Sequence, residues 1–324
     1  MRCGALVLAL VLLAASARWA PAADLRATEV LGLRVGHGSG AFPRRVDPWL
    51  MDLFAVDSQG RFLFLDPQDG PGAVGIYDPH GKFLRRIPVL RPEDRRWPVR
   101  AYHLWVDGAD NLYLWLGVFA KPASYTRVRM FDTAGRFIRD IDIQGATARY
   151  VDRHGHIFGD TLAGVVKEFD ANGQLVRQVP GMSHSLDLLV DPEGQILFRQ
   201  GPAPEGIAIA PELAPDRGDL FRDRAGNYYW NASVDGICAD FFKYGPDRIL
   251  LDQFSHVALM RRIGYRHRAV EYLRNGGTKS TTSSGRFCTL GWYLSPGDQI
   301  YALAGSDSLP KGQPWLRVLH VEVQ

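Results

Sequence analysis

The chain has 324 residues, of which 46% are hydrophobic and 11% are aromatic. This composition supports a large buried core and excludes a disordered chain. The formal net charge is only +3, so bulk electrostatics gives no reason to expect a nucleic acid or an anionic membrane as partner. The basic residues are mostly arginine, which indicates either anion recognition or an arginine-rich genome.

Residues 1–23 have the pattern of a secretory signal peptide. Arg2 supplies the positive start, Ala5–Ala15 is an unbroken apolar run, and Ala20-Pro21-Ala22 offers a cleavage site between small residues. No later stretch approaches the roughly 20 apolar residues of a membrane-spanning helix. The sequence therefore predicts a secreted or periplasmic protein with no membrane span.

The stretch Leu53–Pro88 is the unit from which the rest of the chain is built. Asp57 with Gly60, and Asp78 with Gly81, bracket two tight turns, because Asp caps a turn locally and Gly tolerates positive φ. Short apolar runs between such turns predict hairpins of β-strands. The unit reads as a four-stranded antiparallel meander with strands near Leu53–Val56, Arg61–Leu65, Ala73–Tyr77 and Phe83–Ile87.

The same turn pattern recurs along the chain. A Val-Asp pair followed by Gly, or a variant of it, marks each unit at Asp57, Asp107, Asp152, Asp191, Asp223 and Ser295. Most intervals match the 40 to 50 residues of a propeller repeat. The interval after Asp191 is short and rich in Pro and Ala, so we expect abbreviated outer strands there. The last interval contains an insertion at about residues 256–286.

These units predict an all-β fold, a six-bladed β-propeller of four-stranded antiparallel blades. Residues 24–324 would form this single domain. Its last unit has three strands ending in Trp315–Val323, and the N-terminal segment Thr28–Val35 can supply the fourth. Sharing a blade between the two ends of the chain would close the ring and remove exposed strand edges.

The chain resembles six-bladed propellers of the NHL-repeat type. The resemblance depends on the V-D-x-x-G turns and on the D-x-x-G half-units at Asp78, Asp132 and Asp170, and it covers most of residues 49–324. It implies the fold. It implies little about function, because this fold carries binding modules and unrelated enzymes.

In such a ring the tight turns fall on one end and the longer loops on the other. The turns collect carboxylates and the loops collect arginines, so we expect the loop face to bind an anionic ligand or a protein partner. The alternative is that the loops are solvated and arginine-rich only because the whole chain is. The predicted binding residues are Arg95, Arg96, Arg100, Tyr102, Trp105, Arg261, Arg262, Arg266 and Arg268.

The leading alternative is a metal-dependent hydrolase or lyase with its site at the mouth of the central channel. A set of His103, His184, Asp187 and Asp219 would then hold a divalent metal. Enzymes with this fold use several channel histidines or an acidic trio, and neither set is clear here. The sequence therefore favours a monomeric, non-catalytic binding or scaffold protein without a cofactor.

Two cysteines, Cys238 and Cys288, remain after the signal peptide. In an oxidising compartment such a pair is a candidate disulfide. The alternative is two separate buried thiols.

Overall fold

The computed structural model describes residues 25–33, 54–66, 72–96, 99–119, 125–161, 163–179, 188–190, 193–198, 208–209, 220–233, 239–247, 249–256, 258–259, 287–306 and 316–323. Nearly all regular structure in these ranges is β-strand. Five sheets have four antiparallel strands, each matching the predicted meander. This confirms an all-β propeller of four-stranded antiparallel blades.

The first three blades follow one another along the chain in simple meander order. Blade 1 contains β2 Phe54–Val56, β3 Phe62–Asp66, β4 Ala73–Tyr77 and β5 Phe83–Pro88. Blade 2 contains β6 Val99–Val106, β7 Leu112–Val118, β8 Tyr125–Phe131 and β9 Phe137–Ile141. Blade 3 contains β10 Thr147–Val151, β11 Ile157–Asp160, β12 Val166–Phe169 and β13 Leu175–Val179.

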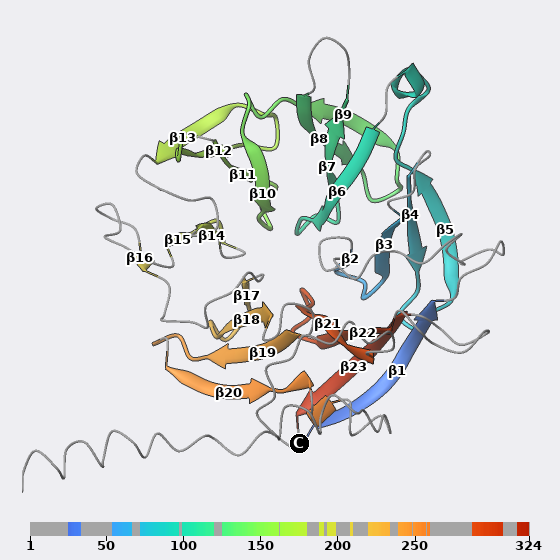
Figure 1. The fold of residues 1–324 in the computed structure, drawn as a ribbon, viewed down its shortest axis with the longest axis vertical. Coiled ribbons are helices and arrows are strands. Elements are labelled where there is room, and N and C mark those ends of the chain that lie inside the picture. The colour runs from blue at the N-terminus through green and yellow to red at the C-terminus, as the bar shows by residue number, and fades with distance from the viewer. Residues whose placement is uncertain are drawn as a thin grey trace, which may run out of the picture.

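The last two blades complete the four-stranded set. Blade 4 contains β17 Leu220–Arg222, β18 Tyr228–Ser233, β19 Ala239–Tyr244 and β20 Leu250–Phe254. Blade 5 contains β21 Phe287–Leu294, β22 Ile300–Ser306, β23 Leu316–Val323 and, at its outer edge, β1 Leu25–Leu33. The sheets stand around a common axis, with β2, β6, β10, β17 and β21 nearest to it (Figure 1).

The prediction of six four-stranded blades is wrong, because the described residues form five. Between blades 3 and 4 lies a smaller sheet of three short strands, β14 Leu188–Val190, β15 Ile196–Phe198 and β16 Ala208–Ile209. Its hairpin β14–β15 is antiparallel, but β16 pairs with β15 in parallel. The segment around β16 contains Pro202, Pro204, Pro211 and Pro215. Proline has no N–H to donate to a ladder, which is consistent with the short strands of this sheet.

The strand β1 joins the two ends of the chain in one sheet, as predicted. It pairs antiparallel with β23 from Leu25↔Val323 to Leu33↔Leu316. On its other side, a Cβ added at Gly81 of blade 1 would lie 2.2 Å from the Val30 carbonyl oxygen. This close approach is consistent with the predicted closure of the ring, because it places β1 directly beside the first blade.

The outer strands β5 and β9 pack against the following blade in the same way. A Cβ at Gly135 of blade 2 would meet the Ile87 side chain of β5 at 2.6 Å, and one at Gly173 of blade 3 would meet Ile141 of β9 at 2.8 Å. Each glycine has positive φ and closes the turn before the fourth strand of its blade. Glycine at these turns therefore satisfies both the backbone conformation and the close contact between blades.

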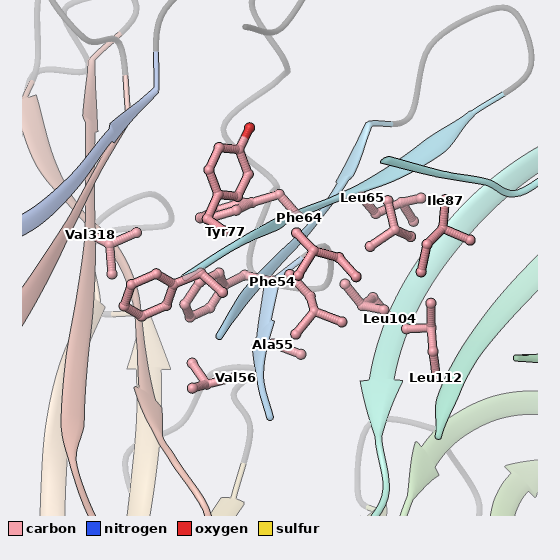
Figure 2. Packing of buried hydrophobic residues seen from close by; sticks show 14 of the residues in the cluster. Phe54, Ala55, Val56, Phe64, Leu65, Tyr77, Ile87, Leu104, Leu112 and Val318 are labelled. Atoms are coloured by element: carbon pink, nitrogen blue, oxygen red, sulfur yellow. The ribbon is translucent and has the colours of Figure 1, made fainter. Parts of the chain in front are cut away.

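The core lies between the sheets, which explains the continuously apolar inner strands. Phe54, Ala55 and Val56 of β2 are all buried, because successive side chains point to opposite neighbours. Figure 2 shows this cluster, in which blade 1 packs against Leu104 and Leu112 of blade 2 and Val318 of blade 5.

Candidate functional site

The tight turns lie together at one end of the propeller, called here the tight-turn end. At Asp57, one carboxylate oxygen accepts hydrogen bonds from the Gln59 N–H at 3.0 Å and the Arg61 N–H at 2.9 Å. The turns at Asp78, Asp107, Asp132, Asp152 and Asp170 repeat this pair of bonds. These aspartates are therefore caps of their own turns.

The second carboxylate oxygen of Asp107 is also engaged. It accepts hydrogen bonds from Asn111 Nδ2 at 2.9 Å and from the Tyr113 hydroxyl at 3.1 Å. Burial and the Asp107 charge raise the pKa of Tyr113 far above its ordinary value. Asp223 repeats the arrangement with Asn227 and Tyr229. Most of the carboxylates that the sequence predicts for this end therefore accept hydrogen bonds within the fold.

Neighbouring tight turns are bonded to one another around the ring. Ser58 donates from its backbone N–H and its hydroxyl to the two carboxylate oxygens of Asp110, at 2.8 and 2.7 Å. The Gly108 N–H donates to the Arg153 carbonyl at 2.7 Å. In each case the residue after the marker Asp contacts the next blade, so these turns hold adjacent blades in register.

The opposite end, called here the loop end, holds the connection between blades 1 and 2. This connection includes the short 3-10 helix η2, Pro92–Arg96. Its Asp94 accepts hydrogen bonds from the Arg91 N–H at 2.8 Å, Arg127 Nη2 at 2.6 Å and Arg129 Nη1 at 2.5 Å. Arg129 is fully buried.

Arg129 continues this network to a second carboxylate. Its Nε and Nη2 bind the two oxygens of Asp140 at 2.7 and 2.8 Å, and its Nη1 also donates to the Val89 carbonyl. Burial alone would raise the pKa of Asp94, but the hydrogen bond from Arg129 and the nearby guanidinium charges bring it below its ordinary value. The network fixes η2, and with it the backbone of Arg95 and Arg96, against blade 2.

An aromatic patch lies at the loop end of blade 2, on the face of the sheet opposite to the side chains of Arg127 and Arg129. Trp115, Gly117 and Phe119 lie along one face of β7 and its end, and Tyr102 packs against Trp115 with ring centroids 4.9 Å apart and an angle of 40° between the ring planes. The register of β6 and β7 shifts between Ala101 and His103, which makes Tyr102 the extra residue of a bulge. Its ring lies over Gly117, where an added Cβ would be 2.7 Å away.

This patch is partly open to solvent. Tyr102 is 36% exposed and Phe119 is 41% exposed. The indole N–H of Trp115 is buried and has no hydrogen-bond partner among the described residues. We call Tyr102, Trp115 and Phe119 the aromatic patch. The sequence analysis placed Tyr102 among the predicted binding residues but not Trp115 or Phe119. Each of these two lies two residues from Gly117, a spacing that places them on one face of a strand.

A central cavity of about 550 Å³ extends from the inner strands to the tight-turn end. Of the predicted site residues, His103 and Trp105 line it, and their rings stack at 4.3 Å. Tyr102, the neighbour of His103 on β6, belongs to the aromatic patch instead. The structure therefore divides the predicted set between two places.

Most of the other predicted site residues cannot be placed. His184, Asp187, Asp219, Arg261, Arg262, Arg266, Arg268 and Cys238 lie outside the described residues. Arg100 lies on β6, and Cys288 lies on β21. Because Cys238 lies outside the described residues, the disulfide stays a prediction. Within the described part of the chain, no group of three His, Cys, Asp or Glu side chains is placed to hold a metal ion. The alternative metal set remains untested, because three of its four members lie outside that part.

The start of the predicted insertion is anchored in blade 4. Asp240 accepts hydrogen bonds from the His256 backbone N–H at 2.9 Å and from Gln253 Nε2 at 2.8 Å, and one of its oxygens lies 2.6 Å from His256 Nδ1. Both Asp240 and His256 are buried. These contacts fix the point where the chain leaves β20.

The sheets define the class of the protein, a β-propeller. No protein-family model matches the sequence, and no curated protein matches it. Among the described residues, no helix is long and apolar enough to cross a membrane.

Several solved structures resemble the chain at low identity. The extracellular domain of a hybrid two-component system from B. thetaiotaomicron is 14% identical with a TM-score of 0.43, over 82% of this chain and 33% of that one. Glutaminyl cyclase from Myxococcus xanthus is 12% identical with a TM-score of 0.41, over 94% and 99%. The Dos1 propeller is 10% identical with a TM-score of 0.39, over 82% and 66%. This chain thus spans about a third of the first of these proteins, and none of the three likenesses bears on its function.

Proposed function

We propose that the protein is an exported, non-catalytic binding or scaffold module that recognises an anionic ligand or protein partner at its loop end. The observation that carries the proposal is the exposed aromatic patch at the loop end of blade 2, the same blade against which η2 packs. Aromatic residues and arginines dominate the residues that contribute most to binding at protein interfaces. Here both kinds come from adjacent segments of the chain.

The framework beneath this surface is rigid. Asp94 holds η2 through Arg127 and the buried Arg129, and Gly117 lets Tyr102 pack flat on blade 2. A surface that is already ordered loses little conformational entropy when a partner binds. Arg95 and Arg96 are the last two residues of η2, and arginine pairs with carboxylate or phosphate through two parallel hydrogen bonds.

Charge reversal tests the proposal directly. Binding of two polyanions, heparin and polyglutamate, is measured by biolayer interferometry at low salt. The double variant Arg95→Glu with Arg96→Glu should abolish this binding, because it replaces two cations by two anions. The control is Lys82→Glu with Arg136→Glu, which changes the net charge equally but lies in the tight turns at Asp78 and Asp132.

The expected result is loss of binding in the first variant and near-normal affinity in the control. Unchanged affinity in the first variant, or equal loss in both, would overturn the assignment to the loop end. The proposal that the protein is non-catalytic has its own test. Stoichiometric metal in the purified protein that is lost in His103→Ala would instead support the channel enzyme.

A further inference from the structure

The lining of the central cavity includes aromatic residues from every one of the five four-stranded blades. Its volume lies within the roughly 300–1,000 Å³ typical of small-molecule sites. These residues lie on the inner strands β2, β6, β10, β17 and β21, whose places are shown in Figure 1. They are Phe54, His103, Trp105, Tyr150, Phe221, Trp292 and Tyr293.

These rings contact one another through both faces and edges. His103 and Trp105 are stacked with an angle of 15° between their planes. Tyr293 meets Phe54 at 5.4 Å and 82°, and Phe221 at 5.1 Å and 66°. A bound cation is attracted only to ring faces. A flat aromatic molecule gains from faces by offset stacking and from edges by T-shaped contact.

The charged residues of the lining do not favour a charged ligand of either sign. Arg153 forms a salt bridge with Glu193, and the Arg224 guanidinium lies 3.9 Å from Asp298 and donates to the Pro296 carbonyl at 3.0 Å. The Arg222 guanidinium lies over the Tyr228 ring, 5.2 Å from its centroid. Asp107 and Asp223 accept hydrogen bonds within their own turns. Because these groups already have partners, a net charge on the ligand would lose hydration without full compensation.

We infer that this cavity binds a small neutral molecule built on a flat aromatic ring system, seated against the His103–Trp105 stack. The site is separate from the loop-end surface. It lies along the axis toward the tight-turn end, and η2 and the aromatic patch do not contribute to its described lining.

Three probes that share one ring system and differ in charge test the inference. Calorimetric titration compares indole, indole-3-carboxylate and tryptamine. Indole should bind with one molecule per chain, and both charged probes should bind more weakly. His103→Ala should weaken indole binding about three- to tenfold, the worth of one lost aromatic contact.

Matched variants separate this effect from damage to the fold. His103→Phe keeps a stacked ring and should retain indole binding. Tyr102→Ala changes the neighbouring residue of β6, outside the cavity, and should leave indole binding unchanged. The Arg95→Glu, Arg96→Glu variant should also bind indole normally, so this site can fail independently of the loop-end proposal.

The inference is overturned if indole does not bind, or if His103→Ala binds it as tightly as the unchanged protein. Tighter binding of tryptamine would indicate a cation cage, and tighter binding of indole-3-carboxylate would indicate an anion site. Either result would also overturn the inference.

Discussion

At the tight-turn end, Asp57, Asp107 and Asp152 each cap two amides of their own turn, whereas at the loop end Asp94 binds side chains of β8. The first kind of carboxylate finds these hydrogen-bond donors within six residues of sequence. The second needs Arg127 and Arg129, more than 30 residues away. Turn carboxylates therefore shape each blade locally, and the loop-end carboxylate fixes the connection between two blades. A count of charges on each end does not distinguish these two uses.

The largest effect should follow removal of the buried cation of the loop end. Arg129→Met leaves Asp94 and Asp140 with Arg127 as their remaining shared guanidinium among the described residues, and breaking a buried ion pair costs about 3–5 kcal/mol. Urea unfolding measures the loss. Arg136→Met, which removes an exposed arginine from its pair with Asp132, is the control and should leave the unfolding free energy nearly unchanged. Similar losses in both variants would contradict the contrast between the ends.

A smaller but clear loss should follow Asp107→Ala at the tight-turn end. The substitution leaves the buried Tyr113 hydroxyl and two turn amides without their acceptor, and such unsatisfied groups cost about 1–3 kcal/mol. The measurement is again the urea midpoint. Asp132→Ala removes a similar cap from an exposed turn and should cost less, because water can replace the carboxylate there. A cost for Asp107→Ala no larger than for Asp132→Ala would show that the second oxygen of Asp107 adds nothing.

The smallest effect concerns the stability of the fold at acid pH. The pKa of Asp94 lies below its ordinary 3.8 in the folded state, so its stabilisation is full above about pH 4 and is lost as pH falls through the folded pKa. The pKa of Asp152 is raised, because burial outweighs the bonds and charges from His156 and His154. The folded state therefore takes up that proton first, which offsets part of the acid loss.

Thermal unfolding between about pH 6 and pH 3 separates the two carboxylates. Asp94→Asn should flatten the loss of stability in acid, and Asp152→Asn should steepen it. Parallel curves for both variants would refute the opposite signs of the two shifts.

The difference between the ends also explains what the sequence could reveal. The turns at Asp57 and Asp78 were predictable because Asp and Gly act within a few residues, and β1 was predictable because the last unit lacked a strand. The parallel pairing of β16 was not, since a proline-rich segment indicates where a ladder weakens but not which partner it finds. The Asp94–Arg129 pair and the contact of Tyr102 with Gly117 depend on tertiary packing and on a bulge, which leave no local pattern.

Hydrogen–deuterium exchange with and without heparin tests most directly whether the two ends have different roles. Our account predicts slower exchange on binding in residues 91–102 and 115–119, with no change in the turns at 57–61, 107–111 and 152–156. Protection confined to those turns, with none near η2, would contradict it.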